Sequence, residues 1–98
     1  MKITMNKNET TLTVVLQGRL DTLTAPELEE ELEPALEHIE KLIFDFSELK
    51  YISSAGLRVL LSAMQVMENQ GEMIVKNVSS AVMEIFEVTG FTDYLTIE

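Results

Sequence analysis

The sequence predicts a single α/β domain. Short apolar runs with a period of two alternate along the chain with longer amphipathic stretches whose period is near 3.6. Alternation of this kind is typical of βα units, in which right-handed crossovers join parallel strands. The chain has 98 residues, the length of one domain, and we expect residues 1–98 to form it without a linker or an internal repeat.

Two short strands are predicted at the start of the chain. Ile3 and Met5 alternate with polar residues, and residues 12–17 alternate in the same way up to Gly18. The polar connector between them, residues 7–10, is of the turn-forming type. The two strands can therefore pair as a hairpin.

The first helix is predicted to begin at Thr24. This residue can cap the helix, Pro26 is tolerated in a first turn, and Glu27 stands where it can close a capping box. Apolar residues follow at helical spacing as far as Ile39, and glutamates fill most of the positions between them. Because Pro34 lacks an N–H group and crowds the preceding turn, we expect a kink or a split in the helix there.

The second half of the chain predicts further strands and helices in alternation. Residues 42–46 form an almost continuous apolar run, which is typical of a strand covered on both faces. Residues 47–50 then act as a connector, an apolar stripe of helical period covers residues 57–67, and Gly71 can stop that helix. The remaining predicted elements are a strand over 73–75, a helix capped by Ser79 or Ser80 and ended by Gly90, and a short strand over 95–97.

Composition argues against several classes of function. The formal net charge is −10, with 7 basic against 17 acidic residues, so neutralisation of nucleic-acid phosphates is not expected. No run reaches the roughly 18 apolar residues needed to cross a bilayer, and no signal peptide follows the N-terminus. We therefore expect a cytoplasmic protein without membrane insertion. The absence of cysteine excludes zinc–thiolate sites and thiol catalysis.

Neither an enzyme site nor a metal or cofactor is expected. His38 is the single histidine, and it stands among glutamates without the spacing of metal ligands. Nucleophilic catalysis by Ser53 or Ser54 needs a base, and His38 belongs to a different helix. Most of the acidic residues are expected on the solvent-exposed faces of helices, where the raised pKa of a catalytic carboxyl is not expected.

The turn before the helix at 57–67 carries the candidate site. Ser53 can cap the helix and Gly56 allows close packing, which would give the turn a purely structural role. The same geometry also suits a modified serine, because a phosphate there would lie near free N–H groups and the positive end of the helix dipole. Such a phosphate would add about −1.5 to −2 charges and repel a docked partner without unfolding the domain.

Three segments of the chain resemble one family of bacterial regulators. The run Asp45-Phe-Ser-Glu-Leu-Lys-Tyr-Ile-Ser-Ser-Ala-Gly-Leu-Arg-Val-Leu-Leu61 is similar to the signature of STAS domains, in particular of anti-sigma factor antagonists. Gly18-Arg-Leu-Asp21, followed by Thr24-Ala-Pro-Glu-Leu28, resembles the family's turn before its first helix, and Val88-Thr-Gly-Phe91 resembles its closing segment. The resemblance implies one STAS domain over 1–98, a βα superhelix around a mixed sheet of four to five strands.

The resemblance also implies a function without catalysis. An antagonist of this family, in its unphosphorylated form, binds an anti-sigma factor that is itself a serine kinase, and so releases a sigma factor for transcription. The kinase ends the complex by phosphorylating the antagonist, and a PP2C-type phosphatase resets it. A scaffold STAS subunit of a transport or stress-sensing complex, never phosphorylated, stays open as the alternative. The sequence identifies neither the sigma factor, the kinase, the signal nor the oligomeric state.

The family pattern assigns roles to particular residues of this chain. It places the phosphoacceptor at Ser54, two residues before Gly56, and this register favours Ser54 over Ser53, which stands where the family commonly has aspartate. Arg58 follows Ser54 at i+4, and we hypothesise that it contacts a phosphate there or the partner. The residues predicted to bind the partner are Asp21, Ser53, Ser54, Gly56, Leu57 and Arg58.

Overall fold

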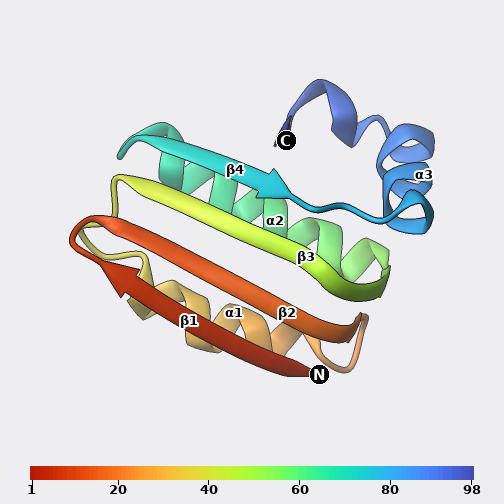
Figure 1. Cartoon of the computed structure of the whole chain (residues 1–98), viewed down its shortest axis with the longest axis horizontal. Helices are drawn as coiled ribbons and strands as arrows, with labels where there is room; N and C mark the ends of the chain where they lie inside the picture. Colours follow the sequence, from red (N-terminus) through yellow and green to blue (C-terminus); the bar gives the residue numbers. More distant parts are fainter.

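Five strands and three helices make up the computed structural model, which describes all 98 residues (Figure 1). The elements in chain order are β1 (Lys2–Asn8), β2 (Thr11–Leu20), α1 (Ala25–Ala35), β3 (Lys41–Ile52), α2 (Ser54–Glu68), β4 (Glu72–Lys76), α3 (Ser80–Thr89), a 3₁₀ turn (Phe91–Asp93) and β5 (Thr96–Ile97). None of the helices combines the length and the apolar character that crossing a membrane requires.

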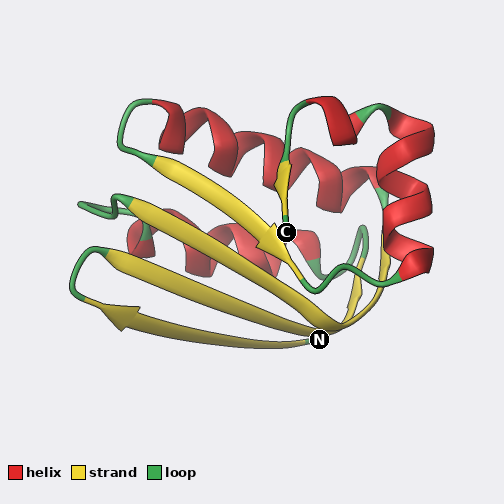
Figure 2. Cartoon of the chain, turned by 45° about the horizontal axis from the view of Figure 1, so that its top comes forward, coloured by secondary structure: helices red, strands yellow, loops and turns green.

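The sheet is mixed and follows the order of the chain. Its strand order is β1-β2-β3-β4-β5, with β1 antiparallel to β2 and every other neighbouring pair parallel. The predicted hairpin is confirmed: Asn8 pairs with Thr11, and Glu9 between them takes a positive φ of 58°. Helices α1 and α2 cover one face of the sheet, while α3 lies where β3 and β4 finish (Figure 2). The α/β fold with a mixed sheet is therefore confirmed.

Strand β3 is longer than its apolar run indicates. The prediction that residues 47–50 are a connector is wrong, because the strand runs on to Ile52 and stays paired with β2. Pairing slips twice: Val15 faces Asp45 but Gln17 faces Glu48, and a second slip follows Gly18. Each slip inserts one extra residue into β3 and breaks the period of two. The two bulges therefore explain why the last part of β3 was predicted to be a connector and not a strand.

Helix α1 ends sooner than its apolar spacing suggests. It finishes at Ala35, one residue after Pro34, so the prediction of helical structure up to Ile39 is wrong. Pro34 cannot donate to the preceding turn, and after Leu36 the chain turns away through His38, whose φ is 64°. Leu36 and Ile39 are nevertheless buried. The apolar spacing thus correctly predicted that Leu36 and Ile39 face the core, although the backbone after Ala35 is no longer helical.

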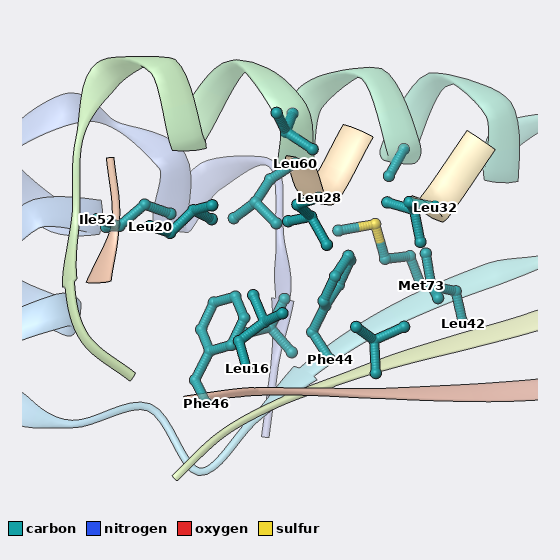
Figure 3. Close-up of a cluster of buried hydrophobic side chains, with 14 of the residues drawn as sticks. Leu16, Leu20, Leu28, Leu32, Leu42, Phe44, Phe46, Ile52, Leu60 and Met73 are labelled. Carbon is teal, nitrogen blue, oxygen red and sulfur yellow. The ribbon is translucent and has the colours of Figure 1, made fainter. Parts of the chain in front are cut away.

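The core fills the space between the sheet and helices α1 and α2 (Figure 3). Phe44 and Phe46 of β3 are fully buried, with their ring centroids 5.7 Å apart. The ring of Phe86 lies 6.3 Å from that of Phe46, which attaches α3 to the same cluster. No polar or charged side chain is among the buried residues. The hydrophobic effect acting on this apolar cluster therefore holds α3 against the end of β3.

Replacement of Phe86 should show how much α3 depends on this contact. We expect Phe86→Ala to lower the free energy of unfolding by about 3–5 kcal/mol, because the ring leaves a cavity that the sheet cannot close. Val88 on the same helix is 81% exposed, so Val88→Ala should change the free energy of unfolding by less than about 0.5 kcal/mol. Urea titration followed by circular dichroism measures both, and equal losses in the two variants would contradict this account of the core.

Candidate functional site

The candidate site lies where β2 and β3 end and α2 begins. Parallel strands bring their carboxyl ends to the same edge, and Figure 1 shows the β2–α1 turn and the start of α2 together at that edge. The last residues of the two strands, Leu20 and Ile52, are paired. The N–H group of Ser53, the residue that follows β3, donates to the Leu20 carbonyl at 2.9 Å. The two turns are therefore tied together by backbone contacts.

Ser53 caps helix α2. It has extended backbone angles, and its Oγ accepts a hydrogen bond from the N–H of Gly56 at 3.4 Å, while its carbonyl accepts from the N–H of Leu57 at 2.9 Å. This is the arrangement of an N-cap, in which a side-chain oxygen replaces a missing backbone acceptor. The capping role predicted from the sequence is confirmed, and the Ser53 oxygen is occupied by it.

Ser54 is the first residue of α2, and its side chain is exposed. Its hydroxyl makes no hydrogen bond within the domain, unlike that of Ser53. The N–H groups of Ser54 and Ala55 have no carbonyl before them in the helix to donate to. An accessible hydroxyl thus stands beside two free donors at the positive end of the helix dipole.

Gly56 and Leu57 are buried, so the structure places these two predicted partner-binding residues beneath the turn. A Cβ atom on Gly56 would lie 2.7 Å from Cγ of Leu20 and 2.8 Å from Cγ1 of Ile52. Both distances are shorter than van der Waals contact allows. Only glycine therefore lets the first turn of α2 sit this close to the strand ends. These residues hold the turn in place, and the exposed Ser54 and Arg58 present it to solvent.

Asp21 closes the neighbouring turn. Its Oδ1 accepts hydrogen bonds from the N–H groups of Leu23 and Thr24 at 3.0 and 3.2 Å. In return, Thr24 Oγ1 accepts from the N–H of Asp21 at 2.9 Å and donates to the carbonyl of Arg19 at 2.8 Å. The predicted capping box with Glu27 is wrong, because the Thr24 hydroxyl is engaged with residues before the helix and makes no cap bond to it.

The surroundings of Asp21 favour its charged form. Partial burial raises the pKa of this carboxyl, but the N–H groups of Thr24 and Leu23 and the nearby Thr24 hydroxyl outweigh that effect. The Arg19 guanidinium adds to them, with its Nε 3.9 Å from Oδ2 of Asp21. The pKa of Asp21 is therefore held below its ordinary value of 3.8.

Both arginines of this acidic chain lie near the candidate site. Arg58 is exposed on the second turn of α2 and forms no ion pair with the domain, so its charge is free for a ligand. Arg19 lies next to the end of β2, where its guanidinium carbon sits 4.4 Å from the ring centroid of Tyr51. Arg58 was singled out from the sequence, but Arg19 was missed because its partner comes from another strand.

Sequence reasoning also missed Leu23. Its side chain is 88% exposed, although its apolar character alone does not separate it from the leucines of the core. The signal that could have found it is the spacing Asp21-x-x-Thr24, which predicts a closed turn whose middle residues face solvent. The prediction that His38 belongs to a helix is wrong: it lies in the turn after α1, at the opposite end of that helix from the Asp21 turn.

The mixed five-stranded sheet and its three helices define a small α/β domain, and the start of α2 is exposed at one edge of it. The model of the STAS domain family matches residues 2–98, and the chain belongs to that family. It is 42% identical over 93 residues to the putative anti-sigma factor antagonist BtrV of Bordetella bronchiseptica, covering 93% of this chain and 80% of that protein. The anti-sigma-B factor antagonist of Bacillus subtilis is 28% identical over 98 residues, covering 99% and 90%.

Solved structures share the fold. An anti-sigma factor antagonist from Mycobacterium paratuberculosis superposes with a TM-score of 0.88 at 20% identity, covering 98% of this chain and 83% of that one. The anti-sigma factor antagonist SpoIIAA in its unphosphorylated form gives 0.78 at 19% identity, covering 99% and 87%. The STAS fold and the resemblance to anti-sigma factor antagonists, both expected from the sequence, are confirmed.

Stability measurements should separate the two serines of the turn. We expect Ser53→Ala to lower the free energy of unfolding by about 1 kcal/mol, because the Gly56 N–H loses its acceptor. Ser54→Ala should change it by less than about 0.5 kcal/mol, since the Ser54 hydroxyl has no partner and alanine favours helices. Thermal or urea unfolding measures both, and equal losses would show that the cap is misassigned.

Acidification should weaken the Asp21 turn. A carboxyl whose pKa is lowered by folding stabilises the folded state above its ordinary value of 3.8, and this contribution is lost as the pH falls through the lowered pKa. We therefore expect Asp21→Asn to be less stable than the wild-type protein at pH 7, with the difference shrinking below about pH 4. Urea unfolding at pH 7, 5, 4 and 3 measures it, and a difference independent of pH would refute the assignment.

Proposed function

We propose that this protein is an anti-sigma factor antagonist whose binding to a serine-kinase anti-sigma factor is switched off by phosphorylation of Ser54. The observation that carries the proposal is the exposed, unbonded hydroxyl of Ser54 in the first turn of α2. A relative that is 42% identical over most of this chain is described as a putative anti-sigma factor antagonist. The domain acts as one unit over residues 1–98, in the cytoplasm.

The turn can accept a phosphate without harm to the fold. The free N–H groups of Ser54 and Ala55 and the helix dipole favour an anion at this position. Arg58 lies four residues along the helix, about 6 Å in axial rise, on the same side as Ser54. A phosphate bound by these groups stays within the domain, so the unphosphorylated and phosphorylated forms share one structure.

The same phosphate opposes a docked partner. It adds about −1.5 to −2 charges and three acceptor oxygens where the unmodified turn presents a small neutral hydroxyl. A kinase that has just transferred a phosphoryl group also holds the remaining phosphates of its nucleotide near the modified residue. Charge repulsion then releases the antagonist, and a PP2C-type phosphatase restores the neutral turn.

Comparison with solved structures supports this scheme at the level of the fold. SpoIIAA has been solved in an unphosphorylated and in a phosphorylated form, and this chain superposes on them with TM-scores of 0.78 and 0.77 at 19% and 20% identity. A domain of this shape thus exists in both states. The assignment of the modified residue to Ser54 rests on the register of the family pattern and on the exposed hydroxyl of this residue.

The proposal assigns binding rather than catalysis to the site. A serine nucleophile needs a base within hydrogen-bond reach. Neither Ser53 nor Ser54 has such a neighbour: the Ser53 hydroxyl accepts a backbone N–H, and the Ser54 hydroxyl faces solvent. Asp21 is engaged by its own turn and contributes a rigid surface beside the serine.

Incubation with the cognate kinase and ATP, followed by mass spectrometry, tests the proposal. We expect one phosphate on Ser54 and none on Ser80, which occupies the same first position of α3 after its own capping serine. Ser54→Ala should bind the kinase like the wild-type protein, whereas Ser54→Asp should bind at least tenfold more weakly, because like charges meet in the interface.

The control for added charge is Gln65→Glu. Gln65 is exposed on α2, eleven residues and about 16 Å of helix from Ser54, so this variant should keep wild-type affinity. No phosphate on Ser54 or Ser53 would overturn the switch and favour the scaffold subunit. Equal affinities for Ser54→Ala and Ser54→Asp would leave phosphorylation without the proposed effect on binding.

A further inference from the structure

We infer that Leu23 is an apolar anchor that inserts into a pocket of the kinase, beside the serine that switches the complex. The inference rests on the proposed function and extends it, because it separates the residue that supplies affinity from the residue that supplies regulation. Leu23 is 88% exposed, more than any other large hydrophobic side chain of the domain. The others that are exposed are Val66 at 40%, Val88 at 81% and Tyr94 at 68%.

Single exposed leucines are ordinary on protein surfaces, so exposure alone does not identify an anchor. What distinguishes Leu23 is the turn that carries it. Its N–H is bound by the Asp21 carboxylate, and the residue after it, Thr24, is bound to the Arg19 carbonyl. One residue further, Ala25 is buried and donates its N–H to the Asp21 carbonyl at 2.8 Å. The leucine is thus held outward by a backbone that is fixed on both sides.

A fixed backbone increases what an exposed side chain contributes to binding. A flexible loop loses conformational entropy when a partner orders it, and this loss is subtracted from the affinity. The hydrogen bonds of the Asp21 turn have already ordered the backbone around Leu23. Burial of the leucine in a partner therefore returns most of the hydrophobic free energy of the side chain.

Leu23 is also close enough to Ser54 for one partner to cover both. The chain from Leu20 to Leu23 spans at most about 11 Å, and the Leu20 carbonyl is bound to the N–H of Ser53. A stable interface covers about 800 Å² on each partner, or roughly 28 Å across. Figure 2 shows the β2–α1 turn and the start of α2 at the same end of the sheet. An interface of this width around the Ser54 hydroxyl is therefore large enough to include Leu23.

The position of Leu23 predicts which residue sets the affinity of the complex and which residue regulates it. Leu23 is neutral, so phosphorylation of Ser54 leaves its contact unchanged and acts through charge alone. Loss of Leu23 should weaken the unphosphorylated complex and leave the response to a charge on Ser54 intact. The kinase surface that receives it must hold an apolar pocket of leucine size beside its nucleotide site.

The test compares Leu23→Ala with Val88→Ala, since both wild-type residues are exposed aliphatic side chains. Isothermal titration with the cognate kinase should show that Leu23→Ala weakens binding about tenfold or more, while Val88→Ala stays within about twofold. Leu23→Met retains an apolar side chain of similar size and should restore most of the affinity. Unchanged thermal unfolding of Leu23→Ala confirms that the fold is intact.

Phosphorylation kinetics give a second measurement. Leu23→Ala should need a higher concentration for half-maximal phosphorylation of Ser54, yet reach the wild-type rate at saturation. Wild-type affinity and kinetics in Leu23→Ala would overturn the anchor while leaving the proposed function standing. If instead the wild-type protein neither binds the kinase nor is phosphorylated, the proposed function itself fails. The behaviour of the wild-type protein therefore distinguishes failure of the proposed function from failure of the Leu23 anchor.

Discussion

The site depends on the close approach of the first turn of α2 to the end of β2. At Gly56 the helix lies so near Leu20 and Ile52 that a single Cβ atom would overlap both side chains. The hydrogen bond from Ser53 to the Leu20 carbonyl fixes the same contact from the strand side. Because the Asp21 turn follows Leu20 directly, this approach also sets where that turn stands relative to the serines.

The charges around the candidate site differ from those of the rest of this acidic domain. The chain carries a formal net charge of −10, with a helix α1 rich in glutamate, so most of its surface repels anions. Both arginines, the free N–H groups of α2 and its helix dipole lie at the edge where β2 and β3 end. These groups would stabilise the phosphate that the proposed modification places on Ser54.

The sequence predicted the local features of this chain well and its long-range features less well. The cap at Ser53 and the hairpin depend on residues within a few positions of one another. The extension of β3 to Ile52 depends on pairing with β2 some thirty residues earlier, and two bulges hide the alternation that would reveal it. The candidate serines could therefore be named from the sequence, whereas Leu23 was missed, because its exposure follows from the hydrogen bonds of the turn between Asp21 and Thr24 and not from its apolar character.

The switch proposed at Ser54 needs more than the local geometry of a helix start, and a second helix of the same chain offers a comparison. Ser79 and Ser80 begin α3 as Ser53 and Ser54 begin α2, with Ser79 Oγ accepting the N–H of Val82 at 3.3 Å and Ser80 exposed after it. Four residues on, however, Ser54 is followed by Arg58, whereas Ser80 is followed by Glu84. A phosphate on Ser54 gains a cation, and one on Ser80 would face a carboxylate. The residue after each cap supplies the accessible hydroxyl, and in the proposed switch the residue one helical turn further on decides whether a phosphate there has a cation beside it.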